Sequence, residues 1–153
     1  MQDKIEFIFK APDKSPGYLL NQLYLLWHRK VKSVLDPLNL THTQFVLLAS
    51  IAWLTNKKND ITQVEIANLN NYDRMMVSKV LRTLQAKKLI ERREHGTDTR
   101  AKIVTLTANG KKTLQAALTK VEKMDIDFFT GNEKEIDYFN AYLQKVMNAN
   151  RDK

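Results

Sequence analysis

The sequence contains no cysteine among its 153 residues, and only four glycines and three prolines. The absence of cysteine excludes disulfide bonds, thiolate metal sites and thiol-based redox sensing. No apolar run approaches the ~18 residues that a membrane-spanning helix needs, and residues 1–10 lack the apolar core of a signal peptide. We therefore expect a soluble, cytoplasmic protein with no membrane partner. A chain of this length predicts a single domain, residues 1–153, built around one core.

The sequence also lacks the groups of side chains on which enzymes and metalloproteins depend. It has no Ser/His/Asp or Cys/His arrangement, no phosphate-binding loop and no pair of catalytic carboxylates. The acidic residues at 133–137 are better explained as the first turn of a helix. The three histidines, His28, His42 and His95, are too scattered to predict a metal site. We therefore predict no enzymatic activity, no metal and no cofactor.

Positive charge is unevenly distributed along the chain. The net charge is +8 and the isoelectric point is near 9.6. Residues 1–59 carry 8 Lys and Arg against 4 Asp and Glu, residues 60–112 carry 11 against 6, and residues 113–153 carry 6 against 7. The basic excess avoids the last part of the chain, as expected if only part of the molecule faces a polyanion. An ordinary solvated basic surface explains the charge equally well.

Apolar spacing and capping signals predict a mostly α-helical fold with one small β-hairpin, in the order α-α-α-α-β-β-α-α. Two capping boxes, Thr41 with Gln44 and Thr62 with Glu65, mark helix starts. The brief turn at residues 70–71 between two short helices indicates a helix-turn-helix. The expected helices span residues 18–36, 41–54, 62–69, 73–88, 107–130 and 132–149, and the expected strands span residues 89–94 and 102–106.

The helix expected at residues 73–88 carries the clearest binding signal. Its apolar side chains fall on one side at ~100° per residue. The opposite side places a short polar side chain between long basic ones. The residues of this second side are Met75, Ser78, Lys79 and Arg82, with Arg74 beside them. Such a face suits a helix in the major groove, where Lys and Arg donate to guanine edges or phosphates. An amphipathic helix with a solvated basic face is the alternative.

The expected hairpin is basic as well. Arg92 and Arg93 precede its tip, Asp98 and Arg100 lie on it, and Lys102 follows. An arginine on a protruding loop can enter a narrow minor groove, and Asp98 can orient Arg100 through a charge-assisted hydrogen bond. A local ion pair on a solvated hairpin is the alternative. A basic hairpin directly after a basic helix favours DNA binding.

Residues 89–110 resemble the wing and the following helix start of the MarR family, the multiple-antibiotic-resistance-type regulators. Members of this family carry an Asp-x-Arg wing motif, here Asp98 and Arg100, and a Leu-Thr-x-x-Gly motif, here at 106–110. In much of the family a glycine precedes the Leu-Ile pair, where this chain has lysine at 87 and 88. The resemblance implies a winged helix-turn-helix that binds double-stranded DNA.

The resemblance also implies how the chain is divided. Residues 41–110 form the DNA-binding region, and residues 18–36 and 113–149 form the helices of a homodimer. In such a dimer the recognition helices enter successive major grooves and the wing arginine reaches the minor groove. The DNA-binding residues expected here are Arg74, Met75, Ser78, Lys79, Arg82, Asp98, Arg100 and Lys102.

Many members of the family release DNA when a small, often aromatic, molecule binds between the dimer and DNA-binding regions. The candidate wall residues are Tyr24, Trp27, His28 and His42, which suit plain core or interface packing as well. We predict a sequence-specific homodimeric regulator, a repressor on an inverted-repeat operator, with a small aromatic ligand as its candidate effector. Two alternatives stay open: a basic structural protein that binds DNA or RNA without sequence preference, and a winged-helix module that binds proteins.

Overall fold

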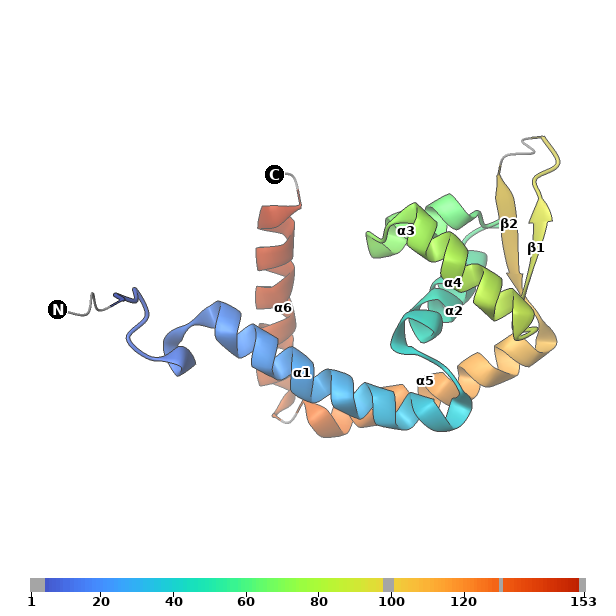
Figure 1. Ribbon diagram of the computed structural model, residues 1–153. Coiled ribbons are helices and arrows are strands. Elements are labelled where there is room, and N and C mark those ends of the chain that lie inside the picture. The colour runs from blue at the N-terminus through green and yellow to red at the C-terminus, as the bar shows by residue number, and fades with distance from the viewer. Residues whose placement is uncertain (1–4, 98–100, 130, 152–153) are drawn as a thin grey trace.

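Residues 5–97, 101–129 and 131–151, which this computed structural model describes, form six α-helices and one two-stranded antiparallel sheet (Figure 1). Their order confirms the fold class predicted from the sequence. The helices are α1 (Pro16–Leu35), α2 (His42–Thr55), α3 (Gln63–Asn70), α4 (Arg74–Ala86), α5 (Ala108–Phe128) and α6 (Glu133–Asn150), and the strands are β1 (Ile90–Glu94) and β2 (Lys102–Leu106). Two 3-10 turns, η1 (Pro12–Lys14) and η2 (Asp36–Leu38), flank α1.

Polar side chains fix the start of each helix. At α2, the Thr41 hydroxyl accepts a hydrogen bond from the Gln44 N–H (3.2 Å), and Gln44 Oε1 accepts one from the Thr41 N–H (3.2 Å). The same reciprocal pair joins Thr62 and Glu65 at α3. The other N-cap residues are Ser15, Asp73, Thr107 and Asn132. These side chains satisfy backbone donors that the helix itself leaves without partners.

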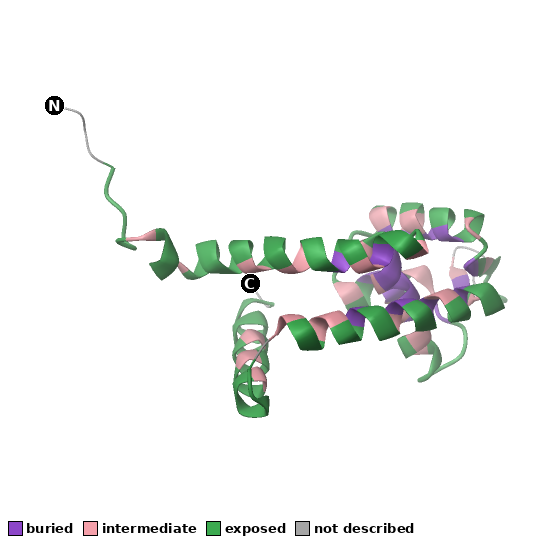
Figure 2. Cartoon of the chain, turned by 90° about the horizontal axis from the view of Figure 1, so that it is seen from below, coloured by how far each residue is buried: buried purple, intermediate pink, exposed green. Residues whose placement is uncertain are grey.

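Helix α2 lies at the centre of the hydrophobic core. Leu47, Leu48 and Ile51 are fully buried, as its nearly continuous apolar sequence predicts. The C-terminal half of α1, with α3, α4, α5 and the sheet, packs around it, and the buried residues gather there in Figure 2. In the part of the chain that the structure describes, no helix has the length and apolarity to cross a membrane.

The hairpin is anchored to the core at its base. Ile90 lies opposite Leu106 at the base, and Glu94 lies opposite Lys102 toward the tip. On the other side of β2, the Val104 N–H donates to the carbonyl of residue 61 (2.8 Å), so the segment before α3 is tied to the sheet. Because Ile90 and Val104 are buried, the base of the wing is part of the core.

The backbone at Leu89, between α4 and β1, lies very close to the start of α5. Lys88 has a φ of +58°, in the left-handed region that glycine adopts more readily than any other residue. The Thr107 hydroxyl donates to the carbonyl of Lys88 (2.8 Å), and the Thr107 N–H donates to that of Leu89 (3.1 Å). A Cβ atom on Gly110 would lie 1.9 Å from the Leu89 carbonyl oxygen. Position 110 therefore accepts only glycine while the backbone keeps this path.

Helices α1 and α5 lie side by side and run in opposite directions (Figures 1 and 2). Trp27 Nε1 donates a hydrogen bond of 2.7 Å to Asp125 Oδ1 across this pair. Helix α6 differs, because none of its described residues is buried and it stands away from the winged-helix region. Its Phe139 ring lies 5.8 Å from the ring of Phe129 just before it, measured between centroids.

Candidate nucleic-acid interface

Helix α4 has one buried face and one free face. Its N-terminus is capped by Asp73, whose carboxylate accepts from the Met76 N–H (2.9 Å). Val77, Leu81 and Leu84 are fully buried in the core. The burial of these three side chains orients the helix, so the opposite face is turned to solvent.

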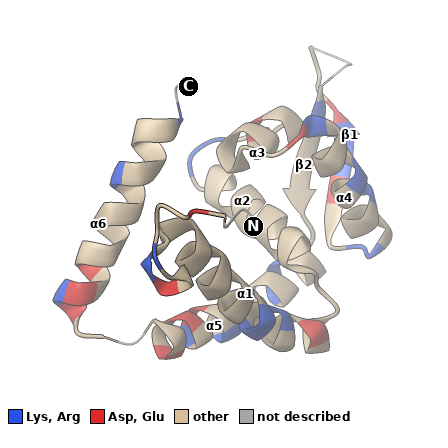
Figure 3. Cartoon of the chain, turned by 60° about the vertical axis from the view of Figure 1, so that its left-hand side comes forward, with Lys and Arg blue, Asp and Glu red and all other residues tan. Residues whose placement is uncertain are grey.

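The free face of α4 carries the predicted recognition residues. Met75 is 83% exposed, and Arg74, Lys79 and Arg82 are exposed. Ser78 lies half-buried among these longer side chains. Within the described residues, none of the three cationic groups has a carboxylate partner. The Lys and Arg positions of α4 and β1 lie near one another at the right of Figure 3. This face has the charge and the free donors that a DNA groove requires.

A polar contact that sequence reasoning missed sets the position of α3. The Asn70 amide donates to Ser50 Oγ (2.8 Å) on α2 and to the carbonyl of Ile66 (2.8 Å). Asn71 then makes the turn into α4 with a φ of +53°. Ser50 is nearly buried, so this bond ties the helix-turn-helix to the central helix. The turn at residues 70–71 was predicted from the sequence. The hydrogen bond to Ser50 was not, because Ser50 lies 20 residues from Asn70 and local sequence does not indicate contacts over that separation.

The wing residues differ in what the structure shows of them. Lys102 is half-buried and forms an ion pair with Glu94 across the hairpin (3.1 Å). Its ammonium group is therefore partly neutralised before any DNA is bound. Asp98 and Arg100, the predicted wing pair, lie outside the described residues.

Arg92 holds a position for which the sequence analysis gave no specific role. Its Nε donates to Gln85 Oε1 on α4 (3.0 Å), and its Nη1 donates to Gln63 Oε1 at the start of α3 (2.8 Å). Burial lowers the pKa of Arg92, and repulsion by Arg82 lowers it further. Its neighbour Arg93 points elsewhere and is paired with Asp60 (2.8 Å). Side chains alternate between the two faces of a strand, so Arg92 lies on the same face as buried Ile90 and Arg93 lies on the opposite face. This alternation is the sequence signal that could have predicted different surroundings for the two arginines.

The four predicted ligand-pocket residues lie together. Tyr24 stacks on His28 at 5.3 Å between centroids, and His42 meets Trp27 edge-on at 5.2 Å. Burial lowers the pKa of His42, repulsion by His28 lowers it further, and Asp125 opposes both. The four residues come from α1 and α2, and Trp27 links them to α5 through its hydrogen bond to Asp125. In the described residues, no group of three His, Asp or Glu side chains is arranged to hold a metal ion.

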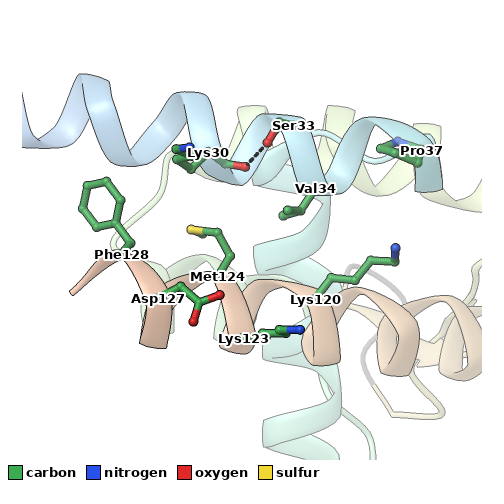
Figure 4. Close-up of a pocket in the computed structure, with 9 residues that line it drawn as sticks. All are labelled: Lys30, Ser33, Val34, Pro37, Lys120, Lys123, Met124, Asp127 and Phe128. Carbon is green, nitrogen blue, oxygen red and sulfur yellow. Dashed lines mark hydrogen bonds between the residues drawn. The ribbon is translucent and has the colours of Figure 1, made fainter. Parts of the chain in front are cut away.

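A separate hollow of about 650 Å³ lies between α1 and α5 and contains none of those four residues (Figure 4). Val34 from α1 and Met124 and Phe128 from α5 provide apolar lining. Lysines 30, 120 and 123 stand around it with Asp127. Local sequence gives no signal for this hollow, because most of its lining residues come from two helices that lie far apart along the chain.

Comparison with known proteins identifies the family. The family model of the ArnR1-like winged-helix domain matches residues 36–125. The HTH-type transcriptional regulator YdcH of Bacillus subtilis, itself described as uncharacterized, is 39% identical over 139 residues, which cover 91% of this chain and 94% of that protein. The S. aureus MepR–DNA complex has a TM-score of 0.81 at 26% identity, covering 88% of this chain and 98% of that one.

A mutant of MarR from E. coli, solved in complex with operator DNA, has a TM-score of 0.77 at 25% identity, covering 86% of this chain and 92% of that one. The chain belongs to the MarR family of winged-helix transcriptional regulators. The sequence-based identification is therefore confirmed. As a MarR-family protein the chain is a DNA-binding transcriptional regulator, and its relatives are regulators rather than enzymes. Where much of the family has a glycine, this member makes the turn with Lys88 at a positive φ.

Proposed function

We propose that the protein is a homodimeric repressor that binds an inverted-repeat operator with sequence specificity. Helix α4 of each protomer enters a major groove, and the wing reaches the adjacent minor groove. The observation that carries this proposal is the free face of α4, where cationic side chains without carboxylate partners among the described residues surround exposed Met75. The MepR and MarR structures similar to this chain were solved with DNA, which supports the same use of the fold here.

The dimer is supported by apolar surface at both ends of the chain. On α1, Leu19, Leu20 and Leu26 are each about half exposed or more, at 48%, 61% and 49%. On α6, Tyr142 is 56% exposed and Val146 is 44% exposed. Exposed apolar side chains concentrated on two elements mark an interaction surface. A two-fold partner that buries them would set the two α4 helices roughly 34–36 Å apart, one helical turn of DNA.

Repression follows from the size of the DNA site. A dimer that occupies two successive major grooves covers roughly two turns of duplex. Such a site within a promoter is closed to other proteins while the dimer is bound. We further propose that a small aromatic molecule weakens this binding, because the Tyr24–His28 and Trp27–His42 contacts lie where α1 and α5 meet the winged-helix region.

Selection of bound sequences from a random DNA pool at near-physiological salt tests the proposal. We expect one enriched inverted repeat whose half-sites lie ~10 bp apart, bound by two protomers. Light scattering at micromolar concentration should give twice the mass of the chain, 17.8 kDa. Transcription in vitro from a promoter carrying the selected site should decrease as protein is added. A pool without enrichment, or a monomer that binds DNA fully, would contradict the proposal.

A further inference from the structure

The junction of α3, α4 and β1 contains an arginine held by two neutral groups. Arg92 projects from β1 toward the core side of the sheet, where it is half-buried. Its two acceptors among the described residues are amide oxygens, Gln63 Oε1 at 2.8 Å and Gln85 Oε1 at 3.0 Å. Among the described residues, no carboxylate lies within ion-pair distance of its guanidinium group. Within the part of the chain that the structure describes, the charge of Arg92 is therefore fixed in position without a neutralising partner.

The guanidinium group keeps donors for a further ligand. It has five N–H groups, and the two hydrogen bonds to glutamine leave three without a described partner. Since Gln63 and Gln85 accept through oxygen, their NH₂ groups are turned away from Arg92 and can donate as well. A planar fork with free N–H groups matches the geometry of a phosphate.

The charge of Arg82 also favours an anionic ligand at Arg92. Arg82 lies three residues before Gln85 on α4, and its charge acts unfavourably on Arg92. Neither cation has a carboxylate partner among the described residues, and an anion bound at Arg92 would offset the repulsion between them. The adjacent Arg93 is different, because Asp60 neutralises it and it is exposed. Of these two neighbouring arginines of β1, Arg93 is held in an ion pair, and Arg92 is the one positioned to bind an anion.

We propose that Arg92, with Gln63 and Gln85, forms a binding site for a single DNA backbone phosphate between the recognition helix and the wing. This site rests on the DNA-binding function above and adds a sequence-independent contact at the base of the wing. The two glutamines fix the guanidinium group before DNA arrives, so little side-chain entropy is lost on binding. The site thereby sets the depth at which α4 lies in the groove.

The experiment measures affinity against salt concentration for the full-length protein on the selected duplex and on a scrambled duplex. Arg92→Gln should reduce the slope of log affinity against log salt by about 0.9, the value for one phosphate. Affinity at low salt should fall on the order of tenfold on both duplexes alike. Arg92→Lys should keep the slope, because it keeps the charge, and lose a few-fold in affinity because lysine cannot bond both glutamines.

Two controls separate this contact from a general loss of charge. Lys123→Gln removes one positive charge from the hollow between α1 and α5, and it should leave slope and affinity unchanged. The double variant Arg93→Gln with Asp60→Asn removes the neighbouring ion pair without a change in net charge, and it should also leave the slope unchanged. If Lys123→Gln changes the slope as much as Arg92→Gln, the effect is general and the proposal is wrong.

Other outcomes are equally decisive. An unchanged slope for folded Arg92→Gln would mean that Arg92 only braces β1 against α3 and α4. A loss confined to the selected duplex would mean that it reads base sequence or groove shape instead of a phosphate. If Arg92→Gln does not fold, unchanged affinity of Arg92→Lys on both duplexes would overturn the proposal. Equal binding of the two duplexes by the wild type would contradict sequence specificity but would still leave the phosphate contact measurable.

Discussion

The winged-helix region and the terminal helices bury very different amounts of their surface. In α2, Leu47, Leu48 and Ile51 have no exposed surface. In α6, no described residue is buried, and Tyr138 is 75% exposed although it is aromatic. Helix α2 contains no Asp, Glu, Lys or Arg, whereas α6 contains five, yet α6 also carries large apolar and aromatic side chains. The difference lies in whether the chain itself supplies the neighbours that cover those residues.

This difference shows in which part of the molecule a single chain covers its own apolar side chains. The winged-helix region is fully packed within one chain, because it shares a single core with the C-terminal half of α1 and with α5. Its exposed α4 face carries the basic side chains that a DNA-binding surface requires. The terminal helices expose apolar side chains that water solvates poorly. In our account, the winged-helix region binds DNA, and a second copy of the chain covers the apolar side chains of the terminal helices.

The largest effect is expected where the winged-helix region is most tightly packed. Gly110→Ala places a Cβ atom 1.9 Å from the backbone oxygen of Leu89, so the α4–β1 connection must move. We expect a loss of about 3 kcal/mol or more in the free energy of unfolding, measured by urea denaturation. Gly17→Ala is the control, because a Cβ atom there meets nothing within 4 Å. Equal stability of the two variants would show that the packing at Leu89 is not rigid.

The next effect concerns the terminal helices. Tyr142→Glu should raise the dimer dissociation constant about 100-fold, or about 2.8 kcal/mol, because it places a charge in the apolar interface. Analytical ultracentrifugation measures this change, and circular dichroism should show the helical content retained. Asn140→Glu adds the same charge at an exposed polar position of α6. The interface would lie elsewhere if both variants dimerise like the wild type.

A smaller effect is expected on the DNA-binding face. Arg82→Ala should reduce affinity for the selected site by ~1–3 kcal/mol and relax preference at one or two base pairs. Fluorescence anisotropy on the selected duplex and its single-base variants measures both quantities. Lys145→Ala on α6 is a control that removes the same charge far from α4. A loss that is equal on every duplex would argue against base recognition by Arg82.

Much of this organisation was predictable from local sequence, because caps and apolar spacing act over three or four residues. Thr41 and Thr62 marked their helix starts correctly, and the apolar spacing within residues 73–88 marked the side of α4 on which Val77 and Leu81 are buried. The Arg92 site was not predictable, because its partners are 7 and 29 residues away and are held by tertiary packing. Glutamine also has no distinctive local signature.

The turn at Lys88 gives a test of local strain in the winged-helix region. Its φ of +58° is unfavourable for a residue with a Cβ atom. We expect Lys88→Gly to raise the free energy of unfolding by ~0.5–1 kcal/mol. Glycine relieves the strain of the positive φ, and the greater conformational entropy of glycine in the unfolded chain offsets part of that gain. Lys87→Gly, at an ordinary negative φ, should lower it instead. Destabilisation by both substitutions would show that Lys88 is not strained.

The smallest effect is expected at the junction between the two regions. Burial and His28 lower the pKa of His42 below its ordinary value of 6.5, against the opposing effect of Asp125. The unfolded chain then binds the proton more readily, so stability is full above about pH 6.5 and falls as the pH decreases toward the folded pKa. His42→Gln should flatten the pH dependence of the free energy of unfolding below about pH 6.5. Parallel curves for the variant and the wild type would contradict this assignment.

The central claim is that a dimer reads DNA sequence through α4. The most direct test is the affinity of the wild type for the selected site relative to a scrambled duplex of equal length, at one near-physiological salt concentration. Our account predicts a ratio of ~10³ or more, with two protomers bound per site. A ratio near one would contradict it, and a basic protein that binds nucleic acid without sequence preference would then be the better description.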